Sequence, residues 1–319
     1  MKLDAVVNDV TNIESITVSD AHNSPTSTAA LKVGSTTLIV GDPITVELGY
    51  DGVTTKVFEG FVKQIDKTVP DNTLLITAQN IMIKAVEFFI ASSTPDNPFT
   101  RFNISAEDLV EDLLDLADIT NYVSDTSNFT FAIFNPMEIN LISSFDICKT
   151  IADILAYSVW ADRDGVAHFE DRRPNPMGGD SSIATIDSNT VYNIIGNTYR
   201  KSDRDLRNRI VVYGAPGITA VAEAESPHLP TGYRKTVVVA SQWIDSQSMA
   251  QDAADFNLDK LNRLTEEVAV EVIGDPVYDA RKVLTIDEDF TGVDGDWYIF
   301  SVEHKWSSAG YLTSMELRR

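Results

Sequence analysis

Residues 41–48, Gly-Asp-Pro-Ile-Thr-Val-Glu-Leu, open the block that decides the fold, because a turn leads directly into a strand of alternating apolar and polar residues. An aromatic strand follows at 57–62 (VFEGFV), and a third strand follows at 73–79 (TLLITAQ). Turn residues separate the strands at Asp51-Gly52 and at 70–72 (PDN). The N-terminal part of the chain is therefore predicted to form short antiparallel strands, as in a barrel or sandwich.

A similar block closes the chain. Gly274-Asp275-Pro276 precedes a strand at 283–286 (VLTI), an aromatic strand at 297–302 (WYIFSV) and a last strand at 311–317 (YLTSMEL). Turn, strand, aromatic strand and strand recur in the same order, so we expect one barrel design to be used twice. A ring of such chains would carry twice as many barrels as subunits.

Helical periodicity appears between the two blocks. Ser105 is expected to cap a helix whose apolar side carries Leu109 and Leu113, and Ser144 is expected to open a second helix. The turn 162–165 (DRDG) predicts a hairpin. The middle of the chain is therefore expected to contain both helices and strands.

Breaker residues at 92–98 (SSTPDNP) mark the first predicted boundary. The predicted domains are a first antiparallel β-barrel at 1–92, an intermediate α+β domain at 93–200, and a second antiparallel β-barrel at 201–319 with a helix at about 246–264. The expected fold class is α+β and mainly β, with two antiparallel barrels and an intervening helix-containing domain.

The charge balance excludes one class of function. The 25 Lys and Arg residues against 48 Asp and Glu residues give a net charge of −23, which argues against nucleic-acid binding by a basic face. The excess can serve solubility alone, or it can keep DNA from sticking to the wall of a passage. The single cysteine, Cys148, excludes an intramolecular disulfide framework. An N-terminus containing Asp4 and Asp9 does not resemble a signal peptide, so we expect a soluble chain made in the cytoplasm.

The search for chemistry assigns no catalytic, cofactor-binding or metal-binding residue. Carboxylate pairs such as Asp112 with Asp115 and Glu266 with Glu267 are expected by chance among so many acids. The four histidines show no i, i+4 pairing, and the chain has no His-Glu-x-x-His, Cys-x-x-Cys, Walker or Gly-x-Ser-x-Gly motif; these histidines are His22, His168, His228 and His304. Cys148 lies within a helical pattern and is a poor nucleophile candidate.

Three tryptophans occupy predicted strands or strand ends. Trp160, Trp297 and Trp306 are expected to serve core or interface packing rather than sugar stacking. His168-Phe169-Glu170 and Glu303-His304 place carboxylates near imidazoles, and in alternating strands such neighbours are expected to be surface pairs.

Five stretches together resemble baseplate hub proteins of contractile-tailed phages, of which late control protein D is an example. They are the Gly41-Asp42-Pro43 turn followed by Val57-Phe58-Glu59-Gly60, the 144–157 helix leading into the Trp160 hairpin and 169–174 (FEDRRP), the 207–214 strand (RNRIVVYG), the stretch 295–304, and 310–313 (GYLT). The resemblance covers nearly the whole chain and rests on the order of patterns rather than on a catalytic signature.

The resemblance implies a structural role without an enzymatic activity. Such hubs are homotrimers in which two tube-type barrels per subunit form a pseudo-sixfold ring. The ring joins the hexameric tail tube to the trimeric central spike and contacts other baseplate proteins. An acidic lumen would let DNA pass in transit, without stable nucleic-acid or membrane binding. The implied location is the tail baseplate of the virion, after synthesis in the cytoplasm of the bacterial host.

Two alternatives remain open at this level. A tail-associated cell-wall hydrolase or glycan-binding module would use an acid near Trp160 or Trp306. A tail tube protein would carry one barrel per chain and form hexamers.

Overall fold

The computed structural model describes most of the chain. The described residues are 2–68, 72–91, 99–127, 129–131, 137–139, 141–155, 157–171, 181–187, 194–287 and 293–319. The predicted boundary cluster at 92–98 and the stretch 172–174 of the family resemblance lie outside these residues.

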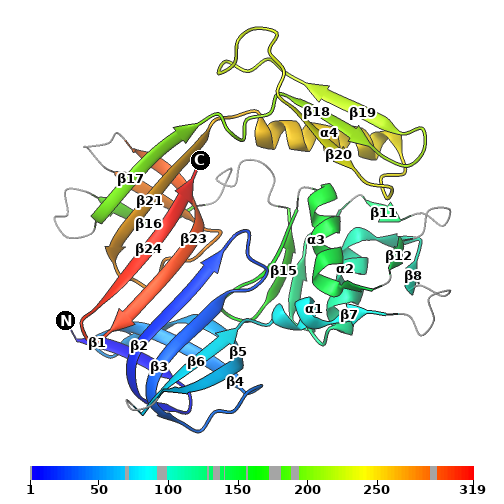
Figure 1. Ribbon diagram of the computed structural model, residues 1–319. Helices are drawn as coiled ribbons and strands as arrows, with labels where there is room; N and C mark the ends of the chain where they lie inside the picture. The colour runs from blue at the N-terminus through cyan, green and yellow to red at the C-terminus, as the bar shows by residue number, and fades with distance from the viewer. Residues whose placement is uncertain are drawn as a thin grey trace.

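Strands from both ends of the chain form one large sheet (Figure 1). Its first half has the strand order β1-β4-β5-β6-β3-β2. Alternation explains why these segments form strands with one buried face, since Ile44, Val46 and Leu48 are fully buried while Thr45 and Glu47 between them are not. The strands of this half are β1 (Leu3–Val7), β2 (Val10–Ala21), β3 (Thr28–Thr36), β4 (Pro43–Tyr50), β5 (Val53–Thr68) and β6 (Thr73–Gln79).

The second half of the sheet repeats this order as β16-β22-β23-β24-β21-β17. The repeat departs from the first half at one pair, because β16 runs parallel to β22 whereas β1 runs antiparallel to β4. The predicted domain boundary at residue 200 falls inside β17, which pairs with β21. The strands of this half are β16 (Ser182–Asp187), β17 (Ile194–Ser202), β21 (Thr265–Ile273), β22 (Val283–Asp287), β23 (Gly295–Ser307) and β24 (Gly310–Arg318).

One irregularity in the ladders recurs at the same place in both halves. The β5–β6 register shifts around Lys63, and the β23–β24 register shifts around Phe300. At the start of β4, Gly41 N donates to Val62 O at 2.8 Å, and at the start of β22, Arg281 N donates to Ile299 O at 2.8 Å. Gly41 therefore corresponds to Arg281.

This correspondence corrects one detail of the sequence interpretation. The three-strand block does recur, as β4-β5-β6 and β22-β23-β24. The Gly-Asp-Pro tripeptides that suggested it are not equivalent, because Gly274 lies seven residues before Arg281 in the sequence. The second tripeptide instead ends β21, where Gly274 N donates to Tyr311 O at 2.8 Å.

The two halves are joined edge to edge, which corrects the expectation of two closed barrels. Residues Ser15 to Ala21 of β2 pair with Ser301 to Ser307 of β23. The described strands thus form one open sheet of twelve strands, with no closed barrel among them. Closing the first half into a barrel would require another strand of that half to pair with the outer edge of β2. In the structure β23 of the second half occupies this edge instead.

Each half has its own apolar core on one face of the sheet. The first core contains Ile16, Leu31 and Phe58. The second contains Trp297 and Leu284, which are fully buried. The opposite face of the sheet carries the polar residues of the alternating pattern.

The middle domain lies beside the first half (Figure 1). Ser105 caps α2, since its side chain accepts a hydrogen bond from Asp108 N at 3.1 Å, as predicted. The predicted hairpin is β14–β15, with Gly165 at φ 77° in its turn. The elements are α1 (Ile83–Glu87), β7 (Phe89–Ile90), β8 (Phe99–Arg101), β9 (Ile104–Ser105), α2 (Ala106–Leu116), β10 (Tyr122–Ser124), β11 (Thr130–Phe131), β12 (Met137–Ile139), β13 (Ile142–Ser143), α3 (Ser144–Leu155), β14 (Ser158–Ala161) and β15 (Ala167–Glu170).

A small α/β unit is inserted between β17 and β21. Its sheet β19-β18-β20 packs on α4, and Ala250, Ala253 and Ala254 of α4 share one core cluster with the middle domain. The helix predicted at about 246–264 is present, but it belongs to this inserted unit rather than to the second half of the large sheet. The elements are β18 (Arg209–Tyr213), β19 (Thr219–Glu223), β20 (Thr236–Ala240) and α4 (Gln247–Leu261).

Candidate assembly surface

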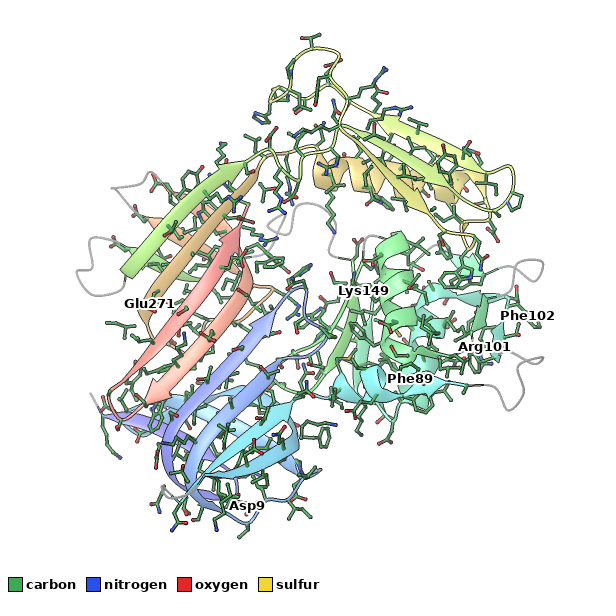
Figure 2. The ribbon with its side chains drawn as sticks, viewed as in Figure 1. Asp9, Phe89, Arg101, Phe102, Lys149 and Glu271 are labelled. Atoms are coloured by element: carbon green, nitrogen blue, oxygen red, sulfur yellow. The ribbon has the colours of Figure 1, made fainter. Side chains whose placement is uncertain are left out.

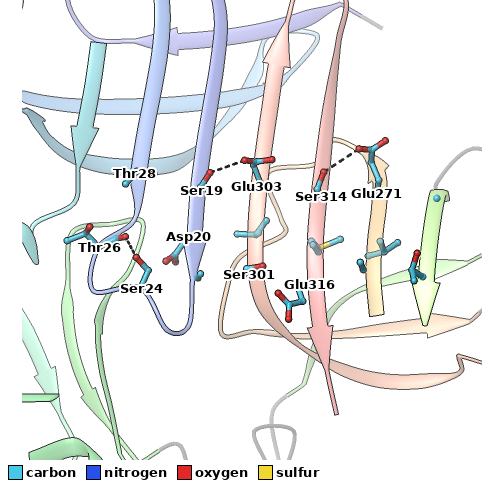
Figure 3. Close-up of a pocket in the computed structure, with 17 residues that line it drawn as sticks. Ser19, Asp20, Ser24, Thr26, Thr28, Glu271, Ser301, Glu303, Ser314 and Glu316 are labelled. Carbon is cyan, nitrogen blue, oxygen red and sulfur yellow. Dashed lines mark hydrogen bonds between the residues drawn. The ribbon is translucent and has the colours of Figure 1, made fainter. Parts of the chain in front are cut away.

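The polar face of the large sheet is a candidate assembly surface. A depression of about 730 Å³ lies on this face across the junction of the two halves. On its floor, Ser19 Oγ donates to Glu303 Oε2 at 3.3 Å, and Ser314 Oγ donates to Glu271 Oε2 at 3.4 Å (Figure 3). Figure 2 shows where Glu271 lies on the sheet as a whole. Small hydroxyl residues and carboxylates make this face polar rather than a packing surface.

Charges on this face are largely paired. Glu303 forms an ion pair with Lys305 of the same strand. Arg318 lies 2.6 Å from Glu316 and 3.4 Å from Glu267. Exposed pairs of this kind contribute about 0–1 kcal/mol each to stability. Basic side chains therefore balance several of the carboxylates on this face locally.

Within the described part of the chain, the strand edges of the large sheet without a strand partner include the outer edges of β1 and β16, one edge of β17 and the end of β5. β17 pairs with β21 on one side alone. β5 pairs with β4 as far as Phe61, so the same edge of β5 is open from Gln64 onward. Open edges are templates for pairing with another chain.

A buried arginine holds the three parts of the molecule together. Arg281 of the second half is 2% exposed, and its Nη1 donates to Asp20 Oδ2 of the first half at 2.7 Å. Nη2 donates to Ala21 O at 2.8 Å, and the guanidinium lies 4.6 Å from the ring centroid of Trp160 in the middle domain. A buried charge with these partners fixes the relative position of the groups that satisfy it.

The contacts of Arg281 with the first half and with Trp160 form a joint between the three parts of the molecule, and His168 extends this joint by stacking on Trp160. The rings of Trp160 and His168 stack with centroids 4.3 Å apart. His168 Nδ1 lies 2.8 Å from Glu170 Oε1, and Nε2 lies 3.0 Å from Asp162 Oδ2. Burial alone would lower the pKa of His168, but hydrogen bonds to the two carboxylates and their charges raise it to about 9. The imidazole is thus held as a cation at neutral pH.

Asp279 is the carboxyl group with the most altered titration near this joint. Burial raises the pKa of Asp279 to about 6, while Arg163, 3.6 Å away, acts in the opposite direction. A raised carboxyl pKa suits a general acid. The cavity beside Asp279 measures about 10 Å³, however, which is room for at most one water molecule.

The candidate glycan-binding residues are placed unfavourably for that role. Trp160 is 4% exposed, and the nearby acids Asp162 and Glu170 are engaged with His168. Trp306 packs against the core of the first half. Trp306 also lines a depression of about 340 Å³, but no Asp or Glu is among the described residues that line it, so an acid is not placed there beside the ring.

The Glu303-His304 neighbours point to opposite faces, as alternation in β23 requires. Glu303 lies on the polar face, whereas His304 is 2% exposed and burial lowers its pKa to about 4. The neutral ring accepts from Tyr311 Oη at 2.8 Å and donates to Tyr278 O at 3.1 Å. This histidine is a core hydrogen-bonding group rather than the surface pair expected from the sequence.

The other residues weighed in the sequence are dispersed. Asp112 pairs with Arg101 at 3.0 Å, and Glu266 pairs with Arg319 at 2.9 Å. Cys148 is buried, and burial raises its thiol pKa to about 12, which makes it a poor nucleophile. Sequence reasoning missed Arg281, and no local signal marks it, because its partner Asp20 lies 261 residues away.

Two classes of site can be assessed over the described residues. They contain no group of three His, Cys, Asp or Glu side chains arranged to hold a metal ion. None of their helices combines the length and apolar character needed to span a bilayer.

Comparison with known proteins shows the fold. No family model and no curated protein sequence matches the chain. The structure matches a tail protein from Neisseria meningitidis MC58 with a TM-score of 0.74 and 14% identity, over 100% of this chain and 97% of that one. It matches the 43 kDa tail protein of prophage MuSo2 from Shewanella oneidensis with a TM-score of 0.72 and 13% identity, over 99% and 98% of the two chains.

A third match extends this likeness beyond phages. The E. coli c3393 protein, described as a component of the type VI secretion system with structural similarity to T4 tail proteins gp27 and gp5, gives a TM-score of 0.60 and 7% identity over 98% of this chain and 76% of that one. The resemblance seen in the sequence is thus confirmed at the level of structure: the chain has the mainly β α+β fold of phage tail and type VI secretion proteins.

Proposed function

We propose that this chain is a structural, non-enzymatic baseplate hub of a contractile phage tail. Three copies would close a pseudo-sixfold ring in which each chain contributes two equivalent units. The observation that carries the proposal is the repeated six-strand unit, whose two copies are already joined edge to edge within one chain. Repeating that junction between chains would extend the sheet around a ring.

The proposed partners follow from this geometry. Sheet units repeated around the ring suit the hexameric tail tube on one side, and threefold symmetry suits a trimeric spike on the other. The middle domain, which lies beside the first half in Figure 1, would bind other baseplate proteins. The chain would act in the virion after synthesis in the host cytoplasm.

The polar face is proposed to line the passage for DNA. Its hydroxyl groups and paired charges offer no basic patch on which phosphates would be held by counterion release. DNA would therefore contact this surface in transit alone.

The repeated unit also separates this proposal from a tail tube protein. A tube protein would carry one unit per chain and form a ring of six, whereas this chain carries the six-strand order twice. The same ring would then need three chains.

Mass photometry and negative-stain electron microscopy of the purified chain test the proposal. We expect particles of about 105 kDa, three times the 35.1 kDa of one chain, with a central passage. Hexamers or monomers at every concentration would contradict the hub assignment. Clearing of peptidoglycan in a zymogram would contradict the non-enzymatic role.

A further inference from the structure

The junction between the two halves provides a template for a contact between chains. In this junction β2 runs antiparallel to β23, with Ser19 opposite Glu303 and Thr17 opposite Lys305. His22 N donates to Phe300 O at 2.7 Å at its end. His22 and Phe300 are therefore a hydrogen-bonded pair. Because hydrogen-bonded and non-hydrogen-bonded pairs alternate in an antiparallel ladder, Ser19 and Glu303, three positions further along, form a non-hydrogen-bonded pair with closely spaced side chains.

Bulges fix which residues of the free edges correspond to this template. The β2–β3 register shifts around Glu14, and the β17–β21 register shifts around Ile195. Ser19 and Arg200 each lie five residues after these positions. In the same way, Glu303 and Asp66 each lie three residues after the shifts at Phe300 and Lys63. Arg200 therefore corresponds to Ser19, and Asp66 corresponds to Glu303.

We propose that β17 of one copy pairs antiparallel with the open edge of β5 in a second copy, with Arg200 opposite Asp66. This proposal rests on the proposed ring and specifies its interface. In this register Tyr199 lies opposite Lys67, Lys201 lies opposite Ile65, and Ser202 lies opposite Gln64. The contact is heterologous, which is the type of contact that generates rings.

Charge complementarity supports this partner. Inside the chain, the row pairs a serine hydroxyl with a carboxylate, as Figure 3 shows for Ser19 and Glu303. Between chains, the equivalent row would pair the Arg200 guanidinium with the Asp66 carboxylate. The Arg200 side chain is 60% exposed and its contact to Glu267 is 3.9 Å, so it can turn toward a new partner.

The neighbouring rows are compatible with the same register. Lys201 would lie diagonally from Lys67 across the interface, a like-charge arrangement that weakens pairing when neither charge is balanced. Glu266 forms an ion pair with Lys201 at 2.5 Å and reduces this repulsion. Opposite Lys67, the Tyr199 ring provides an apolar and π surface for the lysine. The charged edge residues also disfavour pairing in other registers.

A cysteine pair tests the register directly. The double variant Arg200→Cys/Asp66→Cys places the two thiols in a closely spaced non-hydrogen-bonded pair, so oxidation should link chains into covalent trimers containing a 200–66 disulfide peptide. The matched control is Arg200→Cys/Lys67→Cys, in which the second thiol lies on the opposite face of the strand and should link much less. Cys148 does not interfere because it is buried with a raised thiol pKa of about 12.

The outcomes separate this inference from the proposed function. Trimeric rings that form without a 200–66 disulfide, or that link equally in the control, would overturn the register and leave the hub assignment intact. Monomers of the unmodified chain at every concentration would overturn both.

A charge reversal gives a second readout that does not depend on oxidation. Arg200→Asp and Asp66→Arg should each weaken trimer formation about threefold or more, as expected for losing a surface ion pair at each contact. The double variant should recover most of the loss. Equal weakening by the single and double variants would contradict the pairing.

Discussion

The two halves of the large sheet share strand order and two bulge positions, yet Gly41 in the first half corresponds to Arg281 in the second. Both residues have positive φ, 97° and 65° respectively. A glycine adopts this conformation without strain, whereas an arginine held there costs about 1–3 kcal/mol. The second half tolerates the strain because the Arg281 guanidinium has two hydrogen-bond partners in the first half and stacks on Trp160.

The comparison teaches that one backbone design serves two structural purposes. In the first half, the position is a turn with open space around it. In the second half, it is the point at which both sheet units and the middle domain meet. The predictions below test this difference, beginning with the largest expected effect.

Replacing Arg281 should be the most damaging change. Arg281→Ala leaves the Asp20 carboxylate, whose side chain is 14% exposed, without its cationic partner. Removing one member of a buried ion pair costs about 3–5 kcal/mol, so we expect that decrease in the free energy of unfolding measured in urea. The double variant Arg281→Ala/Asp20→Asn should recover part of the loss. A loss below about 1 kcal/mol would show that Arg281 does not hold the halves together.

Raising the pH should weaken the same joint. The pKa of His168 is raised to about 9 in the folded chain, so its contribution is fully present below the unfolded value of about 6.5 and is lost as the pH rises through 9. We expect a loss of about 2 kcal/mol over this interval, less than the shift alone implies because solvent screens a side chain that is 14% exposed. Urea unfolding at several pH values measures it.

His168→Gln is the control for this pH dependence. Glutamine keeps a polar side chain between Asp162 and Glu170 but does not titrate, so the slope of stability between pH 6.5 and 9 should flatten. An unchanged slope in this variant would assign the dependence to other groups.

Substitution of Gly41 should have a smaller effect. Gly41 has φ 97°, and no atom lies within 4 Å of an added Cβ, so Gly41→Ala would introduce backbone strain without a steric clash. We expect a loss of about 1–2 kcal/mol in the free energy of unfolding. Gly41→Asn should cost less, because asparagine tolerates the left-handed conformation better than alanine. Equal costs for the two variants would argue that strain is not the cause.

Local patterns predicted much of the fold. Alternation in Ile44, Val46 and Leu48 identified a strand and its buried face, and Ser105 is a helix cap as its sequence context indicated. These features depend on residues that are close in the sequence, where propensity and hydrogen bonding act directly.

Features that depend on distant partners could not be predicted in the same way. The sequence cannot show that β2 prefers the edge of β23 to closure of its own half, because that choice joins residues nearly three hundred positions apart. The same holds for the Arg281–Asp20 pair and for the assignment of α4 to the inserted unit. The Gly-Asp-Pro repeat pointed to the correct block through turn residues that are not equivalent, since turn chemistry recurs at many strand ends.

The smallest predicted effect compares the two equivalent rows, Ser19 with Glu303 inside the chain and Arg200 at the free edge. Ser19→Ala removes a partly buried hydrogen bond of 3.3 Å and should lower the free energy of unfolding of the dilute chain by about 0.5 kcal/mol. Arg200→Ala should leave the dilute chain unchanged within error, because it removes an exposed contact of 3.9 Å, yet it should weaken association at high concentration. A larger loss for Arg200→Ala than for Ser19→Ala in the dilute chain would mean that Arg200 already acts within its own subunit, and the equivalence of the two rows would then say nothing about contacts between chains.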